Sequence, residues 1–442
     1  MKWLFLVGLI LGTPILAMLL RGRPRMILLV CFLLGPGLYF LGQTLWVSPI
    51  SWVAWPGYVR GIYVSFIDAI SIALITATHR LRIPVSIKLA FAVYCCGLLL
   101  STLTSHFYLM PAAFYAWQLF RTVLLFVAIA RVCGTVPAAP IAIVSGLGLA
   151  LGMESLLVVY QFASGVQRAG GSFSNANYMG LSLDYAVFPV IALMLGTRRL
   201  VWPGLAGLAA IAIAVLGGSR ATLGLLAAGI ALTVLLSLVH RRSGRKFAFA
   251  GATALLLLVS APVMLWAVNR RSEAVLESSN QMRQALKLSA RMIITDYPLG
   301  IGPNSFVVFA NTRGYNDRAG VPWNGENRYV PVHNTYYLVG AEMGLVGLAG
   351  LVSILVALIA LGLRTMRRQF PDDAGELVPG LLATMIIASI HIAYEFVVMD
   401  FVLHAFFAIA AGILVGLKSR AIVEAYSLQP RTIRPVGIVH AV

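Results

Sequence analysis

Thirteen long apolar segments constrain the fold of this chain more than any other feature of its sequence. Each holds close to the ~20 largely apolar residues that a helix needs to cross a bilayer. Charged residues make up only 11% of the 442 residues, against about 25% in soluble domains. These properties exclude a soluble globular protein, a disordered chain and a coiled coil. The segments cover residues 3–20, 26–42, 61–78, 86–102, 112–130, 139–162, 178–196, 201–217, 221–239, 247–268, 334–363, 378–397 and 400–417.

The segments predict an all-α, polytopic integral membrane protein with about 12 or 13 transmembrane helices and one long loop. We interpret the first segment as a retained span rather than a signal peptide, because the basic stretch 21–25 follows it instead of a cleavage site. The chain then divides into N-terminal transmembrane helices (1–268), a loop with an amphipathic helix (269–332), C-terminal transmembrane helices (333–417) and a tail (418–442).

The basic residues predict the orientation of the chain. A formal net charge of +18 could suggest nucleic acid, but in so apolar a chain it is better explained by Lys and Arg retained on the cytoplasmic side. We therefore expect no nucleic-acid partner. By the positive-inside rule the basic short loops and the C-terminal tail are cytoplasmic, and the long loop lies outside. The residues that set this orientation are Arg21, Arg23, Arg25, Arg80, Arg82, Lys88, Arg131, Arg198, Arg199, Arg241, Arg242, Arg245, Lys246, Arg364, Arg367, Arg368, Lys418, Arg420, Arg431 and Arg434.

Several kinds of chemistry have no support in the sequence. The four cysteines include no C-x-x-C pair, which argues against a disulfide framework or a zinc site. The chain also lacks a D-x-D cluster for a divalent metal, a Walker-type phosphate loop, an H-E-x-x-H motif and a G-x-S-x-G motif. ATP hydrolysis, metalloprotease and serine hydrolase activities are therefore poorly supported. We expect neither a metal nor another cofactor.

The long loop is basic although it is predicted to lie outside. Long loops escape the positive-inside rule, which is one explanation; an anionic ligand is the other. Within the loop, residues 272–295 have the spacing of an amphipathic helix, with Arg283, Lys287 and Arg291 on one stripe. Such a helix could lie at the membrane interface with its basic stripe toward the phosphates of membrane lipids.

Two residues stand out as candidates for chemistry at the outer membrane boundary. His333 lies where a polar loop enters a long apolar segment, at or near a helix N-terminus. The helix start disfavours imidazolium, which suits a neutral base; the alternative is a capping or interfacial histidine. Arg220 follows Gly217-Gly218-Ser219 in a tight outward turn. Arginine at a membrane edge needs an anionic partner, either a distant carboxylate or a ligand phosphate.

Further candidates come from three other outward segments. Arg291 precedes a Gly-x-Gly turn whose N–H groups could approach phosphate oxygens, although a salt bridge or a lipid contact is an alternative. The segment from Arg168 to Asn177 offers a cation, amides and hydroxyls, a mixture suited to sugar hydroxyls; an ordinary loop is the alternative. Arg60 could be a headgroup anchor or another phosphate ligand. Possible substrate-binding residues are accordingly Arg60, Arg168, Asn175, Asn177, Asn304 and Asn334.

Other ionisable residues fall within or at the ends of the apolar segments. Intramembrane ionisable residues are functional candidates by default. Because these are scattered over six segments, pairs between helices explain them better than a single relay. They are Glu342, Glu154, Asp184, Asp68, Glu395, Asp400, His391 and His404.

The ordered motifs resemble those of the O-antigen ligase superfamily, which also contains O-antigen polymerases and bacterial protein O-oligosaccharyltransferases. The resemblance covers about residues 171–347, under half of the chain. It rests on the segment 171–177, Gly218-Ser219-Arg220, Arg291 with Pro298-x-Gly300-x-Gly302, and the segment 333–338 with Glu342-x-Gly344-Leu345-x-Gly347. The resemblance implies a GT-C-like helical glycosyltransferase with a large periplasmic loop.

The resemblance also implies a function and roles for three residues. It implies transfer of a polysaccharide from an undecaprenyl-diphosphate-linked O-antigen donor to a lipid A-core acceptor, with inversion and without a metal. The active site would face the periplasm from the bacterial inner membrane. Arg220 and Arg291 match the donor-binding arginines, and His333 matches the essential histidine. No motif separates ligase from polymerase, protein glycosylation remains a third possibility, and a lipid-glycan transporter is disfavoured because no inverted repeat is evident.

Overall fold

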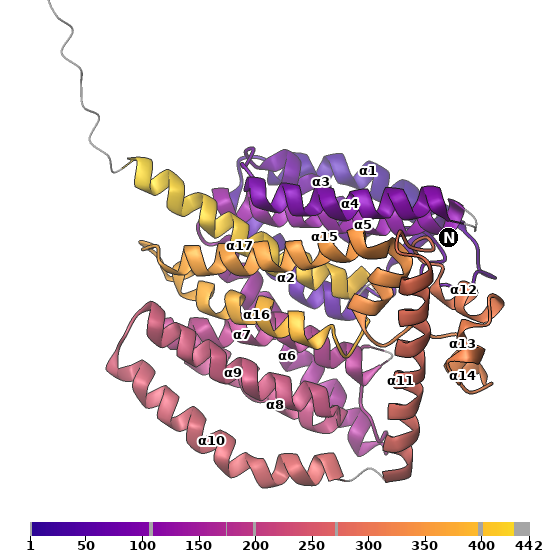
Figure 1. Ribbon diagram of the computed structural model, residues 1–442. Coiled ribbons are helices and arrows are strands. Elements are labelled where there is room, and N and C mark those ends of the chain that lie inside the picture. Colours follow the sequence, from indigo (N-terminus) through magenta and orange to yellow (C-terminus); the bar gives the residue numbers. More distant parts are fainter. Residues whose placement is uncertain are drawn as a thin grey trace, which may run out of the picture.

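The computed structural model describes residues 2–105, 109–173, 175–197, 200–269, 273–396 and 401–427. Long helices lie side by side as a bundle, and α11 stands across one end of it (Figure 1). The bundle helices are α1 (Lys2–Leu20), α2 (Pro24–Pro36, continued by a π turn at Gly37–Leu41), α3 (Phe66–Ala77), α4 (Val85–Thr104), α5 (Leu109–Thr135), α6 (Ala139–Ala163), α7 (Ala176–Gly196), α8 (Val201–Gly217), α9 (Arg220–His240), α10 (Gly244–Asn269), α15 (Thr335–Met366), α16 (Leu377–His391, preceded by a 3-10 turn at Asp373–Glu376) and α17 (Phe401–Ser427).

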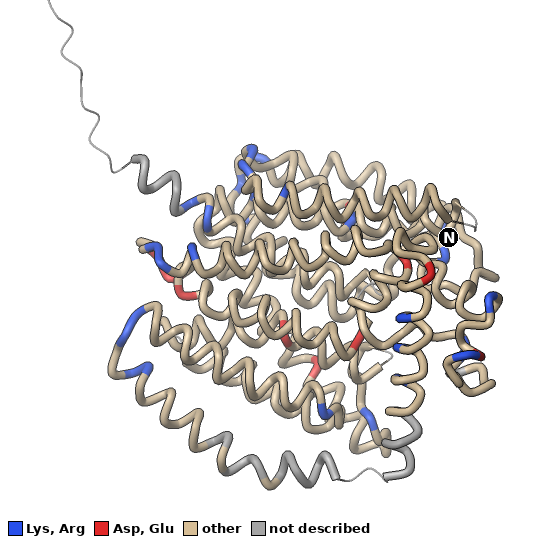
Figure 2. Tube along the Cα trace, in the orientation of Figure 1, with Lys and Arg blue, Asp and Glu red and all other residues tan. Residues whose placement is uncertain are grey.

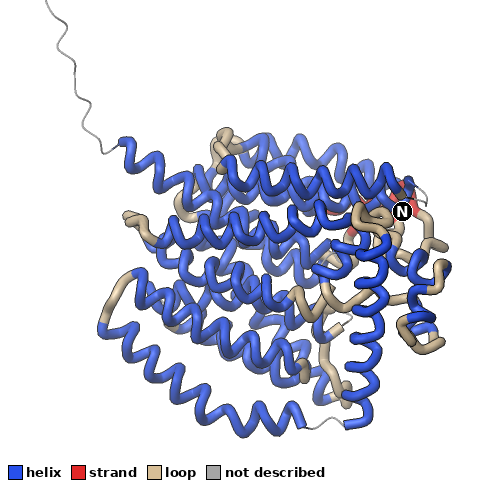
Figure 3. Tube along the Cα trace, in the orientation of Figure 1, coloured by secondary structure: helices blue, strands red, loops and turns tan. Residues whose placement is uncertain are grey.

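Each of the thirteen predicted segments overlaps a bundle helix, and the predicted polytopic helical fold is confirmed (Figure 3). Within the described ranges, ten helices are long and apolar enough to cross a membrane. Two shorter apolar helices, α3 and α8, accompany them. The predicted amphipathic helix is α11 (Glu273–Asp296), and the short helices α12 (Phe306–Thr312), α13 (Tyr315–Arg318) and α14 (Gly325–Arg328) complete the long loop.

Three predicted boundaries were wrong. Residues 61–65 are not helical: β2 (Gly61–Ser65) pairs antiparallel with β1 (Trp46–Ser51), and α3 starts only at Phe66. Ser65 and Asp68 form a capping box there, which fixes the helix start. The segment 378–397 leaves the helical path at His391, so Glu395 sits in the turn that follows. The segment 400–417 continues as α17 to Ser427, into the predicted tail, whose residues 428–442 lie outside the described ranges.

Small residues let the bundle helices approach closely. A side chain on Gly35 of α2 would lie 2.3 Å from the Gly146 backbone of α6, and one on Gly97 of α4 would lie 2.3 Å from the Gly347 backbone of α15. Close backbone contact at glycine is the usual way for helices to pack in lipid, where apolar burial gives little drive. The most enclosed helix is α7, which is apolar on all sides and forms the centre of the core.

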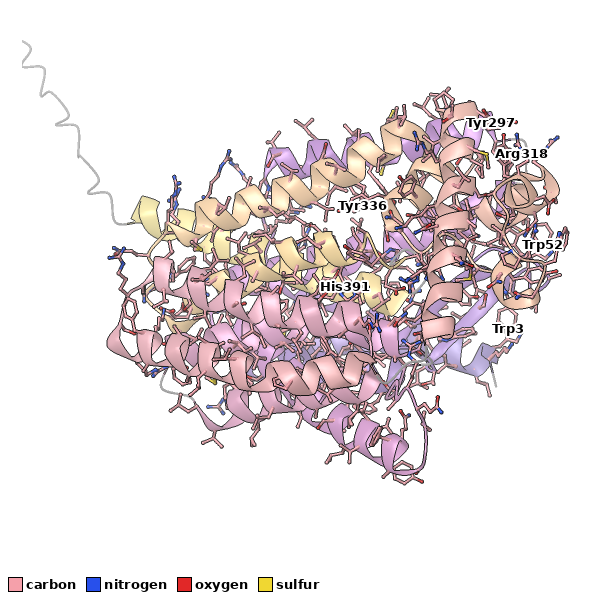
Figure 4. The ribbon with its side chains drawn as sticks, turned by 60° about the horizontal axis from the view of Figure 1, so that its bottom comes forward. Trp3, Trp52, Tyr297, Arg318, Tyr336 and His391 are labelled. Carbon is pink, nitrogen blue, oxygen red and sulfur yellow. The ribbon has the colours of Figure 1, made fainter. Side chains whose placement is uncertain are left out.

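The two ends of the bundle differ in what they carry. Lys and Arg gather mostly at the two ends, with few along the middle (Figure 2). The turn between α9 and α10 lies at one end, and α11 to α14 lie at the other (Figure 1). Trp52, Tyr297 and Arg318 also lie at the α11 end, whereas His391 lies deeper among the helices (Figure 4). Aromatic side chains of this kind mark membrane–water interfaces.

Candidate active site

The elements that carry the predicted site meet at the α11 end of the bundle. The N-terminus of α15, the turn after α16, the loop between α6 and α7, and α11 itself all reach this end (Figure 1). The start of α15 is tied to the end of α16, because the Thr335 N–H donates to the carbonyl oxygens of Ile392 (2.9 Å) and Glu395 (3.2 Å). This tie holds His333, two residues before Thr335, beside the α16 turn.

His333 faces a buried carboxylate. Its Nδ1 lies 3.5 Å from Oε2 of Glu395, at the outer limit of a hydrogen bond, and its ring centroid lies 4.6 Å from that of Phe396. The His333 side chain is 15% exposed, whereas that of Glu395 is 5% exposed. When Nδ1–H donates to the carboxylate, Nε2 is the free base nitrogen. This imidazole–carboxylate arrangement is the one that orients a general base.

Glu395 is held by two further residues. Its Oε1 accepts hydrogen bonds from Arg283 of α11 (3.1 Å) and from Asn177 of α7 (2.9 Å). Arg168 in turn donates to the Asn177 side-chain oxygen at 2.6 Å. Burial raises the pKa of the Glu395 carboxyl, but the hydrogen bond from His333 and the Arg283 charge outweigh burial and hold that pKa below its usual range. The carboxylate is therefore ionised when it faces His333.

The two predicted donor-binding arginines begin α9 and lie on α11 respectively. Arg220 is the exposed first residue of α9, capped by Ser219. The turn before it packs on the α6–α7 loop: a side chain on Gly217 would lie 3.4 Å from the Ala169 carbonyl. Arg291 is exposed on α11, eight residues after Arg283, or about 12 Å along the helix.

The Gly-x-Gly turn after Arg291 stabilises the fold instead of presenting free N–H groups. The N–H groups of Gly300, Ile301 and Gly302 donate to the carbonyl oxygens of Tyr297, Ala341 and Glu342 respectively, at 2.9–3.1 Å. The Glu342 carboxylate accepts from the N–H groups of Asn304 and Phe306, each at 2.9 Å, and from the Tyr58 hydroxyl. Two of the predicted motifs therefore pack on each other, and these three N–H groups are bonded within the protein.

Three of the candidate asparagines have structural partners. Asn304 is fully buried, and its amide bonds the backbone of Val59 and Pro111. Asn334 caps α15 through the Tyr337 N–H and donates to the Ala393 carbonyl. Asn175 caps α7 through the Asn177 N–H.

Arg60 is exposed on the hairpin loop, where its Nε lies 3.4 Å from the Gly57 carbonyl. Of the six possible substrate-binding residues, Asn177 contacts Glu395, and Arg168 is connected to Glu395 through Asn177.

Only some of the other ionisable residues form the expected pairs between helices. Glu342 and Glu154 instead accept from backbone N–H groups, His404 contacts the Gln118 amide, and Asp400 lies outside the described residues. Asp68 of α3 binds Arg121 of α5 at 2.9 Å, and Asp184 of α7 binds His391 of α16 at 2.6 Å. Glu395, by contrast, belongs to the site, which the sequence reasoning missed by grouping it with these pairs. The signal that could have found it is its place at the end of an apolar segment, facing the side where His333 was expected.

Comparisons with known proteins agree with the motifs. Residues 185–352 match the family model described as O-antigen ligase. This segment contains Arg220, Arg291 and His333, whereas Glu395, Asn177 and Arg168 lie outside it. No curated protein matches the chain. Across the described part of the chain, no cluster of three or more His, Cys, Asp and Glu side chains could hold a metal ion. The 185–352 segment of this chain is therefore similar to the O-antigen ligase family.

Proposed function

We propose that this protein is an O-antigen ligase. It transfers a polysaccharide from an undecaprenyl-diphosphate carrier to the lipid A-core oligosaccharide, at the periplasmic face of the bacterial inner membrane, with inversion and without a metal. The observation that carries the proposal is an imidazole held against a buried, ionised carboxylate, at a membrane edge bordered by arginines.

His333 acts as the general base. Its Nδ1 faces Glu395, so Nε2 takes the proton from the acceptor hydroxyl. The hydroxyl oxygen then forms a bond to the anomeric carbon of the donor from the face opposite the diphosphate. The bond between that carbon and the diphosphate oxygen breaks, and the electron pair leaves with undecaprenyl diphosphate. A general base of this kind contributes about 10²–10⁴-fold to the rate.

Arginines stabilise the charge that develops on the leaving group. Arg220 and Arg291 are exposed at the end of the bundle where His333 lies, and their guanidinium groups can each engage two phosphate oxygens. A positioned donor of this type is worth roughly 3 kcal/mol in the transition state. Because Arg283 is already paired with Glu395, its primary part is to position the carboxylate.

An apolar cavity supports a lipid-linked donor. It measures about 310 Å³ and lies between α4, α5, α15 and α17. Phe91, Leu119, Leu351 and Phe407 line it, and at Thr335 it comes within two residues of His333. A cavity with such walls suits a hydrocarbon tail, whose headgroup would then reach the arginines while the tail stays within the bilayer depth.

Transfer by the purified protein tests the proposal. With an undecaprenyl-diphosphate-linked glycan and lipid A-core as substrates, the wild type should yield glycan-bearing lipid A-core. His333→Ala should abolish transfer while donor binding is largely retained, because the lost interaction belongs to the transition state. The exposed His79 offers a matched control, and His79→Ala should transfer normally.

Two results would overturn the proposal. Transfer that persists in His333→Ala would remove the general base. A wild type that extends the lipid-linked glycan but never modifies lipid A-core would identify a polymerase instead.

A further inference from the structure

A second cavity lies at the same end of the bundle and has a different character. It measures about 340 Å³ and lies between the β1–β2 hairpin, α5, α7 and the start of α17. Its walls include the rings of Trp46, Tyr58, Tyr63 and Tyr178 and the amides of Gln43 and Gln118. The amides distinguish these walls from those of the first cavity, which are apolar although they also include aromatic rings. Rings and amides together match a saccharide, whose C–H faces lie on aromatic rings while its hydroxyls bond to amides.

The cavity is connected to His333 through aromatic rings. Tyr178 lines the cavity and contacts Phe396 edge to face, with 5.8 Å between ring centroids. Phe396 in turn lies 4.6 Å from the His333 ring. Tyr178 and Phe396 therefore link the wall of the cavity to the imidazole.

The charges near the cavity disfavour a phosphate there. Arg121 borders the cavity, but it is buried, bound to Asp68 at 2.9 Å and covered by the Phe401 ring at 3.5 Å. Its charge is thus already compensated. The arginine side chains Arg168 and Arg283 reach the site by another route, through Asn177 and Glu395. The cavity and the arginines approach His333 through different neighbours, which separates a place for an uncharged sugar from a place for the diphosphate.

We propose that this cavity binds the acceptor sugar and presents its hydroxyl to His333. The inference rests on the proposed function. It implies that the acceptor is a saccharide and not a serine or threonine side chain of a protein. The hydroxyl proton passes to His333 Nε2, the oxygen bonds to the anomeric carbon, and the diphosphate departs with the electron pair of the broken bond.

Kinetics with separated substrates test this inference. Trp46 and Tyr63 stack edge to face at 4.7 Å and have no part in the base or the arginines. Trp46→Ala and Tyr63→Ala should raise KM for lipid A-core roughly two- to tenfold, the effect of losing one aromatic contact, with KM for the donor unchanged. Tyr63→Phe keeps the ring and should retain a near-normal acceptor KM. Tyr160, an aromatic residue that is 69% exposed and outside the cavity, provides the control Tyr160→Ala.

Binding of free core oligosaccharide, measured by calorimetry, gives a second readout that does not need turnover. The wild type and Tyr160→Ala should bind it, and Trp46→Ala should bind it several-fold more weakly.

Parallel reactions offer a lipid-linked glycan or a serine-containing peptide as acceptor. A variant that fails to elute as a monodisperse species is replaced by Gln43→Ala, for which the same weakening of acceptor binding is expected, while Tyr63→Phe, which keeps the ring, should bind normally.

The outcomes separate the two proposals. If the wild type transfers glycan to none of the acceptors, the proposed function fails. If the wild type transfers glycan but the cavity variants leave acceptor KM and oligosaccharide binding unchanged, or raise only the donor KM, the cavity is not the acceptor site. Efficient glycosylation of the peptide by the wild type would likewise overturn a saccharide acceptor.

Discussion

At the residue scale, the environment of Glu395 explains how His333 is oriented. One carboxylate oxygen binds Arg283 and Asn177, which leaves the other to face the imidazole. A buried carboxylate would otherwise be costly to ionise, so the cation and the amide are what keep it charged. The charged form fixes the tautomer of His333, and with it the nitrogen that can accept a proton.

Replacing the charge while keeping the shape tests this role. Glu395→Gln should lower kcat, by no more than the ~10²–10⁴-fold that a general base contributes, with donor KM little changed. The exposed Asp373 provides a matched acid far from the site, and Asp373→Asn should have no effect. Rates measured at saturating donor decide the matter; a fully active Glu395→Gln protein would show that His333 needs no carboxylate.

The lowered pKa of Glu395 also predicts how stability depends on pH. A carboxyl whose pKa is lower when folded stabilises the protein above its unfolded pKa, about 4.3, and loses that contribution as pH falls through the folded value. The difference in unfolding temperature between wild type and Glu395→Gln should therefore be constant from pH 7 to pH 5 and shrink below about pH 4. A difference that already disappears between pH 7 and pH 5 would contradict the ionised, paired carboxylate.

A lysine at position 220 tests whether the proposed phosphate contact needs a guanidinium group or only a positive charge. Arg220→Lys retains the charge but replaces a fork that engages two phosphate oxygens with a point charge. We expect transfer to fall on the order of 10²-fold, comparable to the loss of one positioned transition-state donor. Arg313→Lys, at an exposed arginine of the long loop, is the control. Near-normal transfer by Arg220→Lys at equal protein level would mean that only generic positive charge matters there.

At the element scale, the break in α15 decides how the long loop is attached. Gly344 has φ 68° and ψ −174° inside an otherwise helical run, and the turn after α11 fits against it. The Leu345 N–H, which is freed from the helix, donates to the Pro298 carbonyl at 2.9 Å. The α11–α15 junction thus positions both the basic stripe of α11 and His333 at the start of α15.

A side chain at this break should destabilise the protein. Gly344→Ala would place a Cβ 2.4 Å from the Leu299 backbone, at a φ that L residues rarely adopt. We expect a loss of about 1–3 kcal/mol or more. Gly207 of α8 has ordinary helical geometry and open space around it, so Gly207→Ala should be neutral or slightly stabilising. Thermal unfolding in detergent compares the two; equal effects would mean that the break is not under steric constraint.

Elements differ in how far their sequence predicts them. The amphipathic helix 272–295 was predicted closely, because the burial of Leu286, Ala290 and Ile293 follows from helical periodicity alone. The β1–β2 hairpin was missed, because its apolar residues 61–65 run directly into those of α3 and read as one span. Contacts such as Glu395 with Arg283 and Asn177 join residues 112 and 218 positions apart. No local pattern records such pairings, which is why the site was predicted only in part.

At the scale of the whole molecule, the proposed reaction requires the α11 end of the bundle to face the periplasm. The prediction follows from the basic residues at the opposite end, among them those of the α9–α10 turn.

Single cysteines placed at two exposed arginines test this orientation in a cysteine-free background. A membrane-impermeant thiol reagent added to cells with a permeabilised outer membrane should label Arg313→Cys of the long loop. It should not label Arg242→Cys of the α9–α10 turn until the inner membrane is opened. Both variants should first transfer glycan at the wild-type rate. The reverse pattern of labelling would place His333 and the arginines in the cytoplasm, away from a periplasmic acceptor, and would contradict the proposed reaction whatever the chemistry of the site.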